Sequence, residues 1–310
     1  MGGGSSGSCV VGIALPQVYN EKQPRIERAN SLTTLAAWIS VDSRRPSACY
    51  LVSDSKITWP TGAQWDAAQK LFVAEKTPDI FGYCGDVQFP TLALRQVVEQ
   101  ADRGLLFAEG ASSSIRQMAI SDALSAASAA YPAHGDKAST IVHFSRDGEG
   151  RDARFRLWRI DWSKTNPLSS VELALPTESV LVVSLGTGSR ALVERNNDWR
   201  RVQGRTARGI FSSFCDALSG GTDPHSGGAP QLVGLYPRWN GLTFGIVFDG
   251  RRFMAGTEVQ AIANVHPFEW RNELFERVDP LSLARLQDAQ PQPKPQFSRL
   301  SITAAERRND

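Results

Sequence analysis

Residues 33–58 read TTLAAWISVDSRRPSACYLVSDSKIT, and this stretch sets the expectations for the rest of the chain. Two apolar runs within it, residues 35–41 and 48–52, have the length and composition of β-strands. Between them lie residues 42–46, DSRRP, a run of polar and turn-forming residues. The pattern therefore predicts a β-hairpin whose first strand begins beside Thr33.

The rest of the sequence alternates between strand-like and helix-like segments. Strand-like runs cover residues 80–84, 139–144, 155–162, 170–175, 180–184, 231–236, 242–248 and 252–255, and helical periodicity covers residues 90–102, 112–131, a segment from 189, and 206–218. Because strands this apolar need a cover on both faces, each sheet must be packed on two sides. We therefore expect an α+β protein, a four-layer αββα sandwich with two sheets between two helical layers.

Composition divides the chain into three parts. Residues 1–32 begin with a Gly/Ser run and end in polar sequence, which is typical of an extension or propeptide. Residues 33–278 carry the strand and helix patterns and form the expected domain. Residues 279–310 are polar, include the run QPQPKPQ at 290–296, and are expected to form a flexible tail.

Charge and cysteine usage exclude several classes of protein. The 34 lysine and arginine residues face 32 acidic residues, and this balance gives no field that attracts nucleic acid or an anionic membrane. The four cysteines and four histidines show no metal-ligand spacing, so we expect no metal and no cofactor. No run approaches the roughly 18 apolar residues of a membrane span and no secretory leader pattern is present, so a cytoplasmic protein is expected.

Three short motifs carry a resemblance to a known family. Thr33-Thr34 opens the first strand, Asp54 follows the second in the run SDSKIT, and Lys70 comes sixteen residues after Asp54 in the run KLF. In this order and spacing the sequence resembles proteasome β-subunits and their HslV-type bacterial relatives, which are N-terminal-nucleophile hydrolases. The resemblance implies that Thr33 is the nucleophile after cleavage of the Leu32–Thr33 bond, and that Asp54 and Lys70 are its charged partners.

The resemblance also covers two glycine-containing turns. Gly85, in the run GYCGD, takes the place of the glycine whose backbone N–H forms the oxyanion hole in that family. Thr187, between two glycines after a buried strand, takes the place of the residue in a Gly-Ser-Gly turn near the nucleophile. Taken alone, glycine-flanked turns are frequent in all folds, so these two assignments depend on their position in the chain.

The family pattern Asp-x-x-Ser-Gly-Gly occurs twice in this sequence, once starting at Asp216 and once at Asp223. We favour the second copy, with Asp223 and Ser226, because it directly precedes the strand predicted from residue 231. Read without the resemblance, either copy is a helix end or a loop.

The chemistry explains why these residue types are needed together. A threonine hydroxyl is a poor nucleophile at neutral pH and needs a base, which a free α-amino group with an intrinsic pKa of about 7.7–8.0 can provide. By the resemblance, the ammonium of Lys70 would disfavour protonation of that amine, and Asp54 would keep the lysine charged and oriented. The resemblance likewise implies that Gly85 N–H stabilises the oxyanion and that Thr187, Asp223 and Ser226 position the amine and a water molecule.

The sequence departs from the family pattern at two points. Leu32 stands before the nucleophile, where proteasome precursors usually have glycine and HslV-type chains have methionine. The step from Thr33 to Asp54 is 21 residues, about five more than usual, which places an insertion in the hairpin tip. Alone, Thr33 is an ordinary strand residue, Asp54 a turn former and Lys70 a surface charge; only their order and spacing favour a site.

The expected function is that of a self-processed threonine-type endopeptidase acting on peptides or proteins. The resemblance also implies a homo-oligomer, ring-shaped or stacked, and leaves open an ATP-driven unfoldase as partner. Two alternatives remain: a non-catalytic structural or binding subunit of the same fold that retains residues 1–32, and an amidohydrolase of the same superfamily acting on small amides. The retention of Thr33, Asp54 and Lys70 favours an active enzyme.

Overall fold

The computed structural model describes residues 33–42, 45–132, 138–260 and 268–295. The expected extension at 1–32 and the end of the expected tail at 296–310 lie outside these residues. Within them the helices are α1 (Gln88–Asp102), α2 (Ser113–Ala130), α3 (Ser189–Gln203) and α4 (Ala207–Ser219). The strands are β1 (Thr34–Val41), β2 (Pro46–Ser53), β3 (Ile57–Thr58), β4 (Gln64–Trp65), β5 (Leu71–Val73), β6 (Asp79–Gly85), β7 (Ala138–Asp147), β8 (Arg154–Ser163), β9 (Ser169–Leu173), β10 (Val180–Gly186), β11 (Gln231–Leu235), β12 (Leu242–Thr243), β13 (Gly245–Phe248), β14 (Arg251–Met254), β15 (Thr257–Glu258) and β16 (Trp270–Asn272).

Two five-stranded antiparallel sheets form the centre of the molecule. The first has the order β10-β1-β2-β11-β12 and contains the predicted hairpin, in which Leu35 pairs with Ser53 and Val41 with Pro46. The second has the order β5-β6-β7-β8-β9. A smaller sheet, β15-β14-β13-β16, and the short β3-β4 hairpin lie outside them.

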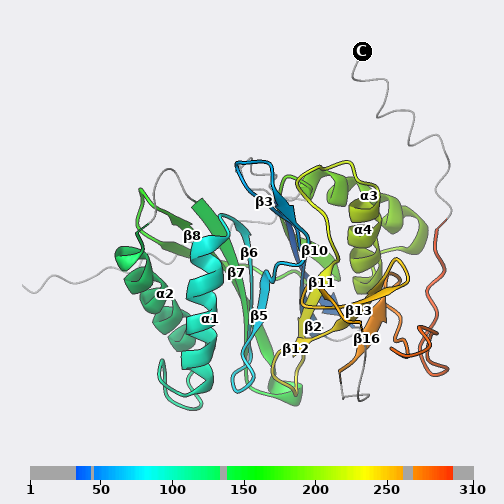
Figure 1. Cartoon of the computed structure of the whole chain (residues 1–310). Coiled ribbons are helices and arrows are strands. Elements are labelled where there is room, and N and C mark those ends of the chain that lie inside the picture. The colour runs from blue at the N-terminus through cyan, green and yellow to red at the C-terminus, as the bar shows by residue number, and fades with distance from the viewer. Residues whose placement is uncertain (1–32, 43–44, 133–137, 261–267, 296–310) are drawn as a thin grey trace, which may run out of the picture.

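Alternation along β1 explains how the first sheet is covered on both faces. Leu35, Ala37 and Ile39 belong to an apolar cluster shared with the second sheet, whereas Ala36 and Trp38 belong to a cluster shared with α3 and α4. Successive strand residues point to opposite faces, so one fully apolar strand serves both clusters. Figure 1 shows α3 and α4 beside the first sheet and α1 and α2 beside the second.

A third apolar cluster joins the second sheet to α1 and α2. Phe81 and Tyr83 of β6 meet Phe89 and Leu94 of α1 and Ile120 of α2 there. The start of α2 is capped because the Ser112 hydroxyl accepts a hydrogen bond from a backbone N–H of the first turn. The layers thus follow from strands that are apolar on both faces and helices that are apolar on one.

A network of buried polar side chains fastens α2 to the second sheet. Asp79 on β6 accepts hydrogen bonds from Arg116 Nε on α2 and contacts His143 Nε2 on β7, both at 2.9 Å. His143 Nδ1 contacts Gln117 Oε1 at 2.5 Å, and Arg116 also donates to Ser145 Oγ. Burial raises the pKa of Asp79, but the hydrogen bond and charge of His143 and the charge of Arg116 outweigh it, so this pKa lies below its ordinary value.

The predicted α+β class is confirmed. The helices predicted at 90–102, 112–131 and 206–218 are found within two residues of their expected ends, and the helix predicted from 189 begins at Ser189. The run at 242–248 is not one strand, because it divides into β12 in the first sheet and β13 in a different sheet. The two-residue strands β3, β4 and β15 and the three-residue strand β16 were not predicted, since segments this short show no periodicity. Assignment to the four-layer αββα sandwich of N-terminal-nucleophile hydrolases stays a prediction.

The segment 279–295 differs from its expected role as part of a flexible tail. Gln292 is buried; its backbone N–H donates to Glu276 Oε1 at 2.7 Å and its Nε2 to Ser212 Oγ on α4 at 2.9 Å. Ala289 is buried as well. A polar sequence can therefore pack when its amides find partners, which composition alone does not reveal.

Candidate active site

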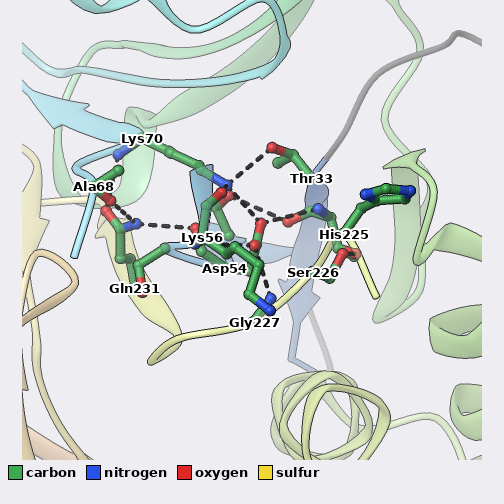
Figure 2. A network of polar contacts seen from close by, with 12 residues as sticks. Thr33, Asp54, Lys56, Ala68, Lys70, His225, Ser226, Gly227 and Gln231 are labelled. Atoms are coloured by element: carbon green, nitrogen blue, oxygen red, sulfur yellow. Dashed lines mark hydrogen bonds and ion pairs between the residues drawn. The ribbon is translucent and has the colours of Figure 1, made fainter. Parts of the chain in front are cut away.

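Thr33, Asp54 and Lys70 meet because three strand ends lie together. Thr33 directly precedes β1 and Asp54 directly follows β2, so the pairing of Leu35 with Ser53 brings their ends side by side. Lys70 precedes β5 in the facing sheet, and its side chain reaches across to both. Figure 2 shows the three side chains converging.

Lys70 Nζ is the centre of this arrangement. It donates to Thr33 Oγ1 at 2.9 Å, to Asp54 Oδ1 at 2.9 Å and to the carbonyl oxygen of Lys56 at 2.6 Å. Asp54 and Lys70 are 0% exposed and Thr33 is 1% exposed. All three hydrogens of the ammonium are thus engaged, which satisfies a buried cation and fixes its direction toward the Thr33 hydroxyl.

The Asp54 carboxylate is held by backbone as well as by Lys70. Thr34 N donates to Oδ1 at 3.0 Å, and the N–H groups of Lys56 and Gly227 donate to Oδ2 at 3.2 and 3.1 Å. Hydrogen bonds of this kind to a charged acceptor offset much of the cost of removing it from water. The ion pair therefore has a single orientation, with its cationic end on Thr33.

The second copy of the repeated motif, with Asp223 and Ser226, lies beside the Thr33–Asp54–Lys70 cluster, and the copy with Asp216 does not. Asp223 Oδ2 accepts hydrogen bonds from Thr187 Oγ1 and Ser226 Oγ, both at 2.6 Å. Ser226 Oγ also contacts Thr34 Oγ1 at 2.6 Å. This trio therefore contacts the residue after Thr33, whereas the Thr33 hydroxyl itself contacts Lys70.

The unfavoured copy belongs to α4. Asp216 Oδ2 accepts a hydrogen bond from Trp199 Nε1 at 2.8 Å and its other oxygen pairs with Lys294 at 3.3 Å. Ser219 is the last residue of α4. This copy joins α4 to α3 and to the 279–295 segment. The motif itself does not reveal that this copy lies away from the Thr33–Asp54–Lys70 cluster.

Gly85 lies at the end of β6 on the wall of a cleft of about 890 Å³. Its φ is +112°, and a Cβ there would come within 2.5 Å of the carbonyl oxygen of Ala138, so only glycine fits. Gly186, Lys56 and Cys84 line the same cleft. Thr33 and Lys70 lie directly behind this lining, because Gly186 packs against the Thr33 carbonyl oxygen and the Lys56 carbonyl oxygen accepts a hydrogen bond from Lys70 Nζ.

The backbone of Thr33 is strained. Its φ is 145°, a value that a β-branched residue rarely adopts. Gly186 lies so close that a Cβ on it would be 1.6 Å from the Thr33 carbonyl oxygen. Strain of this kind costs of order 1–3 kcal/mol and persists only where the surrounding structure imposes it.

Gln231 is the residue of the cluster that sequence reasoning missed. Its Oε1 accepts from Lys70 N at 3.0 Å, and its Nε2 donates to the carbonyl oxygens of Asp54 and Ala68 at 3.1 and 2.8 Å. It is buried at the start of β11 and ties the segment carrying the acid to the segment carrying the cation. The only available signal was a polar residue at the start of an otherwise apolar strand.

No family model matches this sequence, and no curated protein matches it. Among solved structures, the chain is similar to Anbu from Hyphomicrobium sp. strain MC1, in its Gly-1 mutant form. The two are 14% identical, with a TM-score of 0.45, and the match covers 66% of this chain and 81% of that chain. A likeness this distant establishes neither an activity nor a substrate.

Two structural findings bear on the location of the protein and on metal binding. In the described ranges, no helix combines the length and apolarity required to cross a bilayer. Over the same residues, histidine, cysteine and acidic side chains form no group of three that could hold a metal ion. The cytoplasmic location and the absence of a cofactor stay predictions.

Proposed function

We propose that this chain is a threonine-type N-terminal-nucleophile hydrolase with the four-layer αββα architecture, and that Thr33 cleaves amide bonds in peptides. The observation that carries the proposal is the contact of one buried ammonium, Lys70 Nζ, with both Thr33 Oγ1 and Asp54 Oδ1 at 2.9 Å. A buried, fully engaged lysine directed at a hydroxyl is costly to build for stability alone. Beside a cleft, it fits the activation of that hydroxyl.

Self-cleavage comes first in this mechanism. Thr33 Oγ1 attacks the carbonyl carbon of residue 32 and a C–O bond forms. The peptide C–N bond breaks and the hydroxyl proton ends on the Thr33 nitrogen, so the acyl group moves from nitrogen to oxygen. Water then hydrolyses the ester, which releases residues 1–32 and leaves a free amine on Thr33. The strained φ of 145° supports this step, because cleavage of the Leu32–Thr33 bond relieves the strain.

Turnover then uses the liberated amine as the base. The amine accepts the Thr33 hydroxyl proton as Oγ1 attacks the substrate carbonyl, and Gly85 N–H donates to the resulting oxyanion. The protonated Thr33 amine then passes this proton to the leaving nitrogen as the C–N bond of the substrate breaks. Water, deprotonated by the same amine, hydrolyses the ester and restores the hydroxyl.

The remaining groups have supporting roles in the proposal. Lys70 disfavours protonation of the nearby amine, and Asp54 holds Lys70 in place. Thr187, Asp223 and Ser226 form a hydrogen-bonded trio that orients the amine and the attacking water. A homo-oligomeric assembly and an ATP-driven partner are further parts of the proposal, and they rest on the sequence resemblance alone.

Intact-mass spectrometry of the purified protein tests the proposal. The wild-type chain is expected to lose residues 1–32, and Thr33→Ala is expected to stay uncut because it lacks the nucleophile. Ser219→Ala, in the motif copy outside the cluster, is the matched control and should be cut like wild type. An uncut wild-type chain would instead favour a non-catalytic subunit that retains its extension.

A peptide panel extends the test from self-cleavage to turnover. The processed wild-type protein is expected to hydrolyse internal amide bonds of unstructured peptides, whereas Thr33→Ala releases nothing. Hydrolysis of small amides with no cleavage of any peptide would replace the endopeptidase by an amidohydrolase of the same mechanism.

A further inference from the structure

Trp59 is presented to the cleft by a rigid turn. It follows β3 in the connection to β4, where Trp59 N donates to the carbonyl oxygen of Ala63 at 2.9 Å and Gly62 N donates to that of Trp59 at 2.8 Å. Pro60 restricts the turn further, and Gly62 supplies its positive φ of 85°. The backbone of Trp59 is therefore fixed, although the β3-β4 hairpin is short (Figure 1).

The indole of Trp59 is half exposed and lines the same cleft as Gly85, Gly186 and Lys56. Among the described residues it has no aromatic, cationic or hydrogen-bonding partner. An indole offers a large apolar surface and one N–H donor, and it loses little conformational entropy on binding because it has only two side-chain torsions. Its position suits contact with a molecule that enters the cleft.

The charges in the cleft do not favour a charged ligand. Two cations, Lys56 and Arg159, and two acids, Asp86 and Asp161, belong to its lining. Arg159 Nε and Asp161 form an ion pair at 2.9 Å, so the charges of Arg159 and Asp161 largely neutralise each other. Of the cleft-lining residues that the structure describes, Trp59 alone is a large hydrophobic side chain with substantial exposure, so it offers an apolar contact to a ligand.

We infer that Trp59 is a specificity-determining residue, which binds an aromatic or large apolar side chain of an extended peptide while the scissile carbonyl lies at Thr33 and Gly85. This inference rests on the proposed peptidase function and adds the class of substrate. A peptide that fills the cleft is expected to contact Trp59 and Gly85 together, because both line the same cleft. Binding of this kind raises kcat/KM for matching peptides and leaves self-cleavage unaffected.

The hairpin provides a matched control. Trp65 on β4 is also exposed and pairs with Ile57 across the hairpin, but it lies outside the cleft lining. Trp59→Ala and Trp65→Ala therefore remove the same side chain from the same exposed hairpin, and only the first changes the cleft. Both are expected to fold and to lose residues 1–32 like wild type.

The experiment is a position scan with peptides of one alanine-based sequence, in which a single phenylalanine is moved along the chain. Wild type and Trp65→Ala are expected to show about a tenfold higher kcat/KM at one phenylalanine position than with the peptide lacking phenylalanine. Trp59→Ala should lose that gain, so that its kcat/KM is about the same with and without phenylalanine in the peptide.

Two results would overturn the inference, and they are distinguishable. If Trp59→Ala keeps the phenylalanine gain, or if both variants lose it equally, Trp59 does not select the substrate although the peptidase proposal stands. If wild type is processed but cleaves no peptide in the series, the endopeptidase proposal fails together with the inference.

Discussion

At the scale of single residues, the site depends on the space left beside Thr33. Gly186 and Gly62 both have positive φ, at 91° and 85°. A Cβ on Gly186 would meet the Thr33 carbonyl oxygen at 1.6 Å, whereas a Cβ on Gly62 would meet nothing within 4 Å. The two positions share a backbone constraint and differ in what surrounds them.

This difference makes a matched pair of variants. Gly186→Ala is expected to displace Thr33 and abolish loss of residues 1–32, measured by intact mass. Gly62→Ala should lower the free energy of unfolding by about 1–2 kcal/mol, the ordinary cost of an L residue at positive φ, and leave processing intact. Wild-type processing in Gly186→Ala would show that the position of Thr33 is not critical.

At the scale of elements, the buried polar network decides how α2 sits on the second sheet. Asp79 accepts from Arg116 on α2 and contacts His143 on β7, and His143 stacks on Phe81 with ring centroids 4.4 Å apart. Because Arg116 and His143 come from different elements, the loss of one carboxylate removes a contact to each of them at once. Asp79 is 0% exposed, so no water replaces it.

Asp79→Asn is expected to lower the free energy of unfolding by about 3 kcal/mol at pH 7, because it leaves the Arg116 charge buried without its partner. The pKa of Asp79 is lowered in the folded state, so its contribution is complete above the unfolded value of about 3.9 and is lost as the pH falls through the folded value. The difference between wild type and variant should therefore shrink below about pH 4. Urea unfolding at pH 7 and pH 3 measures both effects.

The exposed pair of Glu99 and Arg103 on α1 provides the comparison. Glu99→Gln removes an acid from an ion pair at the surface and should cost less than about 1 kcal/mol at either pH. Equal costs for Asp79→Asn and Glu99→Gln would mean that burial of the network contributes nothing.

At the scale of the whole molecule, the segment 279–295 forms part of the packed structure. Gln292 of this segment contacts α4. The Arg252 side chain of β14 donates to the carbonyl oxygens of Pro280 and Leu281 in the same segment. Lys294 adds an ion pair with Asp216. The ordered domain therefore extends past its expected end at 278.

Truncation measures this contribution. A chain ending at 278 is expected to melt roughly 5 °C below a chain ending at 295, which corresponds to about 2 kcal/mol in a domain of this size. The loss follows from unpaired polar groups at Ser212 and Glu276. Equal melting temperatures, measured by calorimetry, would restore the interpretation of 279–295 as a tail.

The sequence by itself determined the local features of this protein. The hairpin, the helices and the mixed α+β class could be predicted because periodicity and turn residues act over a few neighbouring positions. The spacing of Thr33, Asp54 and Lys70 could also be recognised, since all three lie close together in the sequence, between residues 33 and 70. Their catalytic roles remain predictions.

Only the tertiary structure decided which distant segments complete the cluster. Gln231 contacts Lys70 across 161 residues of sequence, and Ser226 contacts Thr34 across 192. The choice between Asp223 and Asp216, and the packing of 279–295, likewise depend on which strand or helix lies alongside. Such contacts form between surfaces that the fold brings together, and no local pattern records which polar groups will meet there.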